Sequence, residues 1–306
     1  MRSRSIATRQ SAGRVPRSGM NMRILIGSIV AASLAVPLTM GLAAAVSETA
    51  GSGPAVATVP DSVSVEQPAG FPLGNDLPRS LASLPFGPGE ETTFELGYGV
   101  IKAGEATISV VGLQDYFGQS VIHLRTRARS NGFFDAFYKV RDQADSFADA
   151  DSLFARYFNK HLREGGYERD VEIHFDQIHG MAYYPDGRES ETPPGTHDII
   201  TAFFRVRTLP LEAGSIELMP AHGDKRKYDL KVKVLRRETI KTIFGKTACV
   251  VVQPMITEEG LFSHQGDLLV WLTDDERRVP VLMKASIPVG AIEARLTRYT
   301  PGGAWE

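Results

Sequence analysis

This chain of 306 residues has a single cysteine, Cys249. A single cysteine excludes an internal disulfide, and its distance from the N-terminus excludes lipid attachment directly behind an export signal. Cys249 stands in the run 248–252, Ala-Cys-Val-Val-Val, which is typical of a core strand. We therefore expect a buried thiol without a reactive role.

Sequence motifs that carry a reaction are missing as well. No glycine-rich phosphate loop follows a predicted strand, and no Gly-x-Ser-x-Gly nucleophile elbow is present. The seven histidines show no metal-ligand spacing on a recognisable helix. The sequence thus assigns no catalytic residue and predicts neither a metal site nor a cofactor.

Acidic residues are absent from the first 45 positions, which hold six arginines. Arg23 precedes the uncharged apolar run 24–46, and 43–45 supplies the small residues that signal peptidase requires. These features predict a signal peptide over 1–45, cleaved after Ala45, and export to the periplasm. The run is also long enough to span a bilayer, so a retained anchor is the alternative, which Pro37 and the small-residue end disfavour.

The charge of the chain changes once this leader is removed. Loss of six arginines takes the formal net charge from -2 to -8. An acidic protein has no general affinity for a phosphate backbone, so we expect no nucleic-acid partner.

The remaining sequence divides into a linker and a folded part. Residues 46–89 hold seven prolines and few aromatic residues, which predicts a Pro-rich flexible linker. Over 90–301, β-favouring runs alternate with Gly, Asp, Asn and Pro clusters. We predict a single, mainly β domain there: an antiparallel, strongly curved sheet, or a barrel or sandwich, of roughly 10–13 strands. One packed helix is expected near 197–207, with Thr196 as its N-cap.

Histidine, arginine and carboxylate side chains crowd the segment 161–170 and resemble an acid–base site. If Gly165 and Gly166 form a two-residue hairpin turn, His161 faces Asp170 and Arg163 faces Glu168 on the solvent side. The apolar residues of the same strands then point inward: Phe158, Val171, Ile173 and Phe175. This register separates polar from apolar pairs and favours a structural role for the charges.

Aromatic residues are concentrated in the connection 130–138, and further ones lie on the predicted helix. They either plug one end of the curved sheet or line a ligand pocket. The neighbouring strand 119–129 aligns basic side chains on one face, and polar residues on both faces of 139–147 suggest an edge strand or a wet cavity. The candidate ligand-binding residues are Phe133, Phe134, Phe137, Tyr138, Phe203, Phe204, Arg125 and Arg127.

Four segments resemble the bacterial exported family called domain of unknown function 3108. They are Tyr-Gly-Val-Ile-Lys-Ala-Gly at 98–104, Asn-Gly-Phe-Phe-Asp-Ala-Phe-Tyr-Lys-Val-Arg-Asp at 131–142, the stretch 161–167, and Trp-Leu-Thr-Asp-Asp-Glu-Arg-Arg-Val-Pro at 271–280. The resemblance spans roughly 86–300. It implies an exported envelope protein built mainly of antiparallel strands, and it brings no established activity, cofactor or site residue.

Three functions are compatible with these features. The leading hypothesis is a non-catalytic periplasmic protein that binds or carries an amphiphilic envelope component, such as a lipid, a lipid-linked saccharide or a segment of a lipoprotein, which is itself an envelope protein. The second is a structural or adaptor protein of an envelope assembly. The third is a glycan-acting enzyme that uses His161, Asp170 or Glu168.

Overall fold

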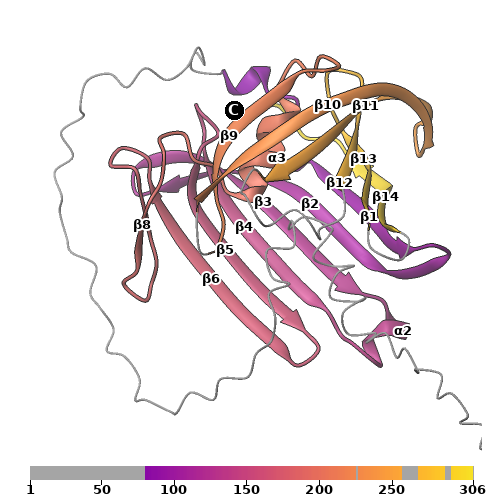
Figure 1. Ribbon diagram of the computed structural model, residues 1–306, viewed down its shortest axis with the longest axis horizontal. Coiled ribbons are helices and arrows are strands. Elements are labelled where there is room, and N and C mark those ends of the chain that lie inside the picture. Colours follow the sequence, from indigo (N-terminus) through magenta and orange to yellow (C-terminus); the bar gives the residue numbers. More distant parts are fainter. Residues whose placement is uncertain (1–79, 225–226, 257–267, 287–290, 306) are drawn as a thin grey trace, which may run out of the picture.

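A computed structural model describes residues 80–305, apart from 225–226, 257–267 and 287–290. The predicted signal peptide and most of the predicted linker lie outside the described residues. Fourteen strands form one sheet, in which every neighbouring pair is antiparallel (Figure 1). The prediction of a mainly β, antiparallel and curved fold is therefore confirmed.

The strands follow one another along the chain. They are β1 (Glu91–Tyr98), β2 (Ile101–Tyr116), β3 (Gln119–Ser130), β4 (Arg141–Asp149), β5 (Ala155–Glu164), β6 (Tyr167–Asp176), β7 (Met181–Tyr183), β8 (Glu189–Glu191), β9 (Ile216–His222), β10 (Lys227–Thr242), β11 (Gly245–Ile256), β12 (Leu268–Thr273), β13 (Pro280–Ser286) and β14 (Ala291–Thr300). The described helices are the 3₁₀ turn η1 (Leu81–Ser83), α2 (Gly132–Asp135) and α3 (Ile199–Arg207).

Strands that follow one another in sequence are also paired in the sheet, except β8 and β9, which are not paired, and the ladder is instead completed by a pairing of β1 with β14. That pairing joins a wing of β1 to β8 to a wing of β9 to β14, and it leaves β8 and β9 as the two edges, so the sheet is not closed. The strand number exceeds the predicted range by one. The additional strand is β8, whose three residues are too few to show a hydrophobic alternation.

The edge strand β9 lies inside the curve of the opposite wing. His222, at the end of β9, is buried, and its Nε2 lies 2.5 Å from the Tyr184 hydroxyl that follows β7. Burial lowers the pKa of His222 to about 4, so a neutral ring shares this hydrogen bond with the hydroxyl. Helix α3 contacts β3, β4 and β9, and therefore fills the space between the two wings (Figure 1).

The predicted helix is confirmed, but its predicted N-cap is wrong. The carboxylate of Asp198 accepts hydrogen bonds from the backbone N–H groups of Ile200 and Thr201, and the Thr201 hydroxyl completes a capping box. Thr196 instead donates its hydroxyl to the carbonyl of Pro193. A carboxylate is the better cap here because it can accept several bonds, including a third from the buried Ser146 hydroxyl at 2.6 Å.

The C-terminal end of α3 is held by a buried ion pair. Arg207 donates to Glu90 at 2.6 Å and to the backbone carbonyls of Arg277 and Arg278. Its guanidinium also lies over the rings of Phe86 and Phe204. The pair is almost completely buried, so each charge depends on the other for stabilisation.

Residues outside the predicted domain limits contact this core. Phe86, from the end of the predicted linker, is buried against Phe204, with ring centroids 4.8 Å apart. The indole N–H of Trp305 donates to the Phe86 carbonyl at 2.9 Å. The two ends of the described chain therefore meet beside α3.

The structure confirms several local predictions. The β5–β6 hairpin pairs His161 with Asp170 and Arg163 with Glu168. The inward-pointing set of Phe158, Val171, Ile173 and Phe175 is buried. Cys249 is buried too, and burial raises the pKa of its thiol to about 11, so it is a weak nucleophile.

Removal of the Arg207 side chain should destabilise the whole domain. Arg207→Ala leaves the Glu90 carboxylate buried without its partner, so the free energy of unfolding should fall by about 3–5 kcal/mol. Urea denaturation measures this loss. The matched control is Arg298→Ala, since Arg298 is 64% exposed and lies 3.9 Å from Glu91, so this change should have little effect. Equal losses in the two variants would contradict the role of the buried pair.

Candidate ligand pocket at the sheet rim

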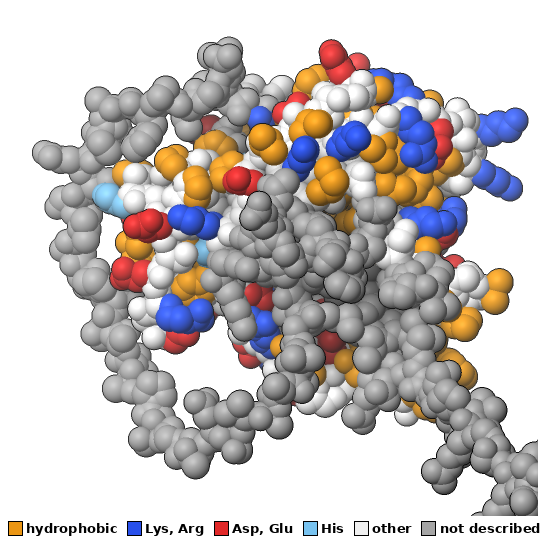
Figure 2. All heavy atoms as spheres, viewed as in Figure 1, with side chains coloured by type: hydrophobic (Ala, Val, Ile, Leu, Met, Phe, Trp, Pro, Cys, Tyr) orange, Lys and Arg blue, Asp and Glu red, His pale blue; other side chains and the backbone are white. Residues whose placement is uncertain are grey.

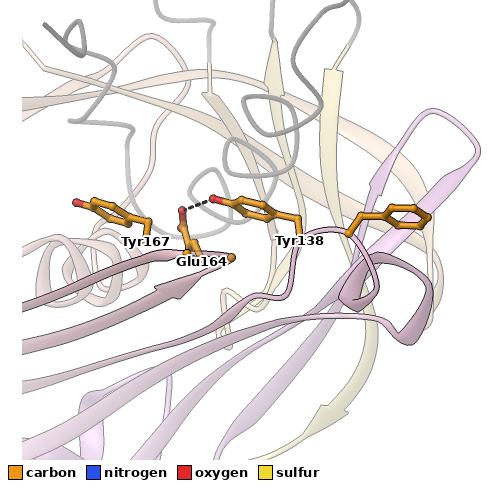
Figure 3. A pocket seen from close by; sticks show the side chains of 6 residues that line it. Tyr138, Glu164 and Tyr167 are labelled. Carbon is orange, nitrogen blue, oxygen red and sulfur yellow. Dashed lines mark hydrogen bonds between the residues drawn. The ribbon is translucent and has the colours of Figure 1, made fainter. Parts of the chain in front are cut away.

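An open pocket lies at the rim of the sheet, where α2 meets the β5–β6 turn. Its volume is about 490 Å³, and its lining residues are Phe137, Tyr138, Glu164, Gly165, Gly166 and Tyr167. Figure 3 shows Glu164 between two tyrosines, with its carboxylate directed towards the hydroxyl of Tyr138. The pocket therefore combines aromatic walls with a single acidic group.

Local sequence explains why these residues meet. The side chain of Asn131 caps α2, and the Ser130 hydroxyl donates to Asp135, so the chain turns back at once towards β4. Tyr138 then packs against the β5–β6 turn. Gly165 has φ +60°, and a Cβ there would lie 2.8 Å from the Tyr138 ring, so both the backbone conformation and the contact require glycine.

The acidic group of the pocket, Glu164, is paired with a second carboxyl group, that of Asp142, which is not a lining residue. Burial, followed by the negative charge of Asp142, raises the pKa of Glu164 to about 7. Burial likewise raises the pKa of Asp142, although its Oδ1 accepts the backbone N–H of Arg163 at 2.8 Å. The two carboxyls hydrogen-bond to each other, so near neutral pH they share a proton and carry about one negative charge.

Deeper on the same face of the sheet lies an ion cluster. The Lys160 ammonium donates to both carboxylate oxygens of Asp224, each at 2.8 Å, and the Arg169 guanidinium is 3.3 Å from the same carboxylate. Asp224 follows β9, while Lys160 and Arg169 belong to β5 and β6. The cluster therefore ties the inner edge strand to the opposite wing and gives the concave face a polar end.

The predicted ligand-binding residues fall into three places. Those from 133–138 lie together around α2: Phe137 and Tyr138 line the pocket, Phe133 is exposed beside them, and Phe134 is buried beneath. The helical pair Phe203 and Phe204 lies elsewhere. The start of α3 bonds to Ser146, which pairs with Leu124 of β3. Six residues of β3 lie between Leu124 and the end of this strand, where α2 begins. The start of α3 and α2 are therefore about 20 Å apart along the strand.

The two predicted arginines do not reach this pocket. Arg125 and Arg127 point to the convex face of the sheet, where they donate to Asp145 at 2.6 Å and to Gln143 at 3.0 Å. The inner face of β3 carries Leu124 and Thr126 instead. The structure thus does not bring these arginines together with the aromatic residues of α2 or α3.

The histidine hairpin also faces away from the pocket. His161 Nδ1 lies 2.7 Å from Asp170, which is also paired with Arg163, and all three side chains are solvent-accessible on the convex face. Within the described ranges, no group of three or more His, Cys, Asp or Glu residues is placed to hold a metal ion.

Asp142 and Glu164 were not among the residues singled out from the sequence. A signal for Asp142 was present, because the polar residues on both faces of 139–147 suggested an edge strand or a wet cavity. Since β4 pairs with both β3 and β5, it is no edge, and its inward carboxyl group hydrogen-bonds to Glu164 of the pocket lining. Glu164 gave no signal, because a charged residue beside a hairpin turn is ordinarily solvated.

A family model for proteins of unknown function, DUF3108, matches residues 93–297, about two thirds of the chain. The chain belongs to the DUF3108 family. The resemblance seen in the sequence is therefore confirmed. A comparison with curated proteins finds no significant match for this DUF3108 chain.

Solved structures provide weak likenesses. A β-barrel-like DUF1849 protein from Brucella abortus is 10% identical, over 71% of this chain and 98% of its own, with a TM-score of 0.49. A protein from Bacteroides fragilis, assigned as exported and with a YmcC-like fold, is 11% identical over the same shares, with a TM-score of 0.33. A protein from Parabacteroides distasonis, assigned as a lipoprotein, is 9% identical over 71% of this chain and 98% of its own, also with a TM-score of 0.33. TM-scores below 0.5 carry no inference about function.

None of the helices in the described part of this DUF3108 chain has the length and apolar character needed to cross a bilayer.

The carboxyl pair should make stability depend on pH. The pKa of Glu164 is above its usual 4.5, so the folded state holds a proton that the unfolded state releases. The resulting stabilisation is full below about pH 4.5 and is lost as pH rises through about 7. Urea denaturation between pH 5 and 8 should show this decline, and Glu164→Gln should reduce it.

The control for this experiment lies in the same hairpin. Glu168 is 73% exposed, so Glu168→Gln should keep the decline of the unmodified protein. An unchanged pH profile in Glu164→Gln would show that the shared proton does not contribute to folding.

Proposed function

We propose that this DUF3108 protein binds an amphiphilic molecule of the bacterial envelope at the rim pocket, without catalysing a reaction on it. The observation that carries the proposal is the arrangement of aromatic walls around Glu164, whose carboxyl group is paired with that of Asp142. Aromatic rings bury the apolar part of a ligand, while a few fixed polar groups orient its head. The proposal includes a periplasmic location, supported by the arginine-rich start and the apolar run 24–46.

The chemistry of the pocket restricts the head group of the ligand. A carboxyl pair that carries about one negative charge repels phosphate or carboxylate groups that have no compensating cation. It can accept hydrogen bonds from an ammonium or from hydroxyl groups, and its shared proton can be donated. We therefore propose an amphiphile whose head is hydroxyl-rich or cationic.

The open side of the pocket suits a ligand that is only partly enclosed. Figure 3 shows the two tyrosines on opposite sides of Glu164, so an acyl chain could lie along the rings while the head contacts the carboxylate. Such a site holds its ligand by burial of aromatic surface. Its affinity should therefore depend more on the two tyrosine rings than on the negative charge of the carboxyl pair.

Native mass spectrometry of the protein isolated from its own cells tests the proposal directly, since an apolar molecule should copurify with it. Titration with a fluorescent monoacylglycerol, which carries a hydroxyl head, provides the affinity. Tyr138→Ala and Tyr167→Ala should each weaken binding about tenfold, because each removes one aromatic wall. Tyr183→Ala is the matched control, since this partly exposed tyrosine lies on β7, outside the pocket.

The same titration can contradict the proposal. If neither a copurified ligand nor saturable binding is found, the pocket is not a binding site for amphiphiles. Equal weakening in all three tyrosine variants would place the binding site elsewhere.

A further inference from the structure

Exposed apolar side chains gather around the pocket on three projecting tips. Val100 and Ile101 belong to the β1–β2 hairpin, Phe133 and Phe137 to α2 and the turn behind it, and Tyr167 to the start of β6. Val100 is 98% exposed, Phe133 69% and Phe137 61%. In Figure 2, hydrophobic side chains protrude on the right-hand side, where Figure 1 places the β1–β2 hairpin and α2.

Hydrogen bonds to backbone carbonyls join the three tips into one rim. The Asn131 side chain donates to the carbonyl of Lys102 at 2.6 Å, and its backbone N–H donates to the carbonyl of Ala103 at 2.9 Å. These bonds hold α2 against the β1–β2 hairpin. On its other side, the N–H of Gly165 donates to the Lys139 carbonyl at 2.7 Å and holds the β5–β6 turn beside α2.

These apolar residues do not contribute to the fold. The β1–β2 turn requires a residue that adopts the left-handed backbone conformation at Gly99, where φ is +57°. It does not require a valine at position 100, which is almost fully exposed. Phe133 contacts Phe134 and Phe137 at ring distances of 5.4 and 5.5 Å, yet most of its surface faces solvent. Exposed apolar side chains grouped on neighbouring tips in this way mark a contact with a partner or a membrane.

The charged groups beside the tips are largely paired with each other. Lys102 lies 2.6 Å from Glu95, Arg129 lies 3.0 Å from Glu105, and Arg141 lies 2.6 Å from Asp135. The rim therefore presents apolar side chains among neutralised charges. Projecting tips of this kind suit a fluid apolar phase, whereas a folded partner would require a surface complementary to three separate protrusions.

We propose that this rim docks reversibly onto the surface of a lipid bilayer, with the three tips inserted at the level of the head groups. The pocket between α2 and the β5–β6 turn then opens towards the lipid. Docking itself does not require that the pocket binds a ligand. The further statement that the membrane is the source or destination of the bound amphiphile rests on the proposed function.

Flotation with vesicles tests the docking. We expect the protein to float with vesicles of phosphatidylethanolamine and phosphatidylglycerol, and to bind phosphatidylcholine vesicles within about threefold as well, because the rim charges are paired. The variant Val100→Ser/Ile101→Ser/Phe133→Ser removes apolar surface without altering a pocket-lining residue. Its partition coefficient should fall at least about tenfold.

A matched variant controls for a general loss of surface hydrophobicity. Ile216, Leu218 and Phe244 are exposed on β9 and at the β10–β11 turn, away from the rim, so Ile216→Ser/Leu218→Ser/Phe244→Ser should float like the unmodified protein. Both triple variants should retain the cooperative urea transition of the unmodified protein, since all six side chains are exposed.

The outcomes separate this inference from the proposed function. The rim variant should keep its affinity for the monoacylglycerol probe in solution while it loses flotation. No flotation of the unmodified protein, or equal flotation of the two triple variants, would overturn docking and leave ligand binding standing. A dimer in sedimentation analysis that the rim variant abolishes would assign the rim to a second copy of the chain and overturn the membrane contact.

Discussion

The two polar attachments of α3 are the constraint on which the rest of this structure depends. An open sheet of fourteen strands curves around a space that must be filled, and α3 fills it with residues buried around most of its circumference. A helix buried in this way brings its unpaired terminal backbone groups into the interior, where they require partners. Asp198 satisfies the first turn and is itself bonded by Ser146, while Arg207 at the last turn binds Glu90 and two carbonyls.

These attachments also fix the relation between the two wings. Ser146 belongs to β4, Glu90 directly precedes β1, and the carbonyls that bind Arg207 come from the turn before β13. A sheet with two free edges has no closing ladder of hydrogen bonds, so its curvature must be set by what it encloses. The helix and the inner strand β9 take that role, and the apolar core is concentrated at their level.

The opposite end of the concave face is polar instead of apolar. There the inward positions carry Asp142, Lys160 and Glu164 in place of branched apolar residues, and the aromatic side chains of α2 lie at the rim. Half-buried carboxyl groups are costly for folding, and groups with raised pKa values are frequent at functional sites. The proposed ligand site and the proposed membrane contact both lie at this end, where polar and exposed aromatic side chains border the apolar core.

The amino-acid sequence by itself determined the antiparallel β class, the helix near 197–207 and the register of the β5–β6 hairpin. Each of these depends on local periodicity and turn chemistry, such as the Gly165–Gly166 turn that aligns His161 with Asp170. Only the tertiary structure decided which candidate residues share a site. The β1–β14 pairing and the inward path of β9 are long-range contacts without a local signature, and they set where each face of each strand points. For that reason Arg125 and Phe203 are separated from Tyr138, while Asp142 and Glu164, 22 positions apart, meet because β4 and β5 are neighbours.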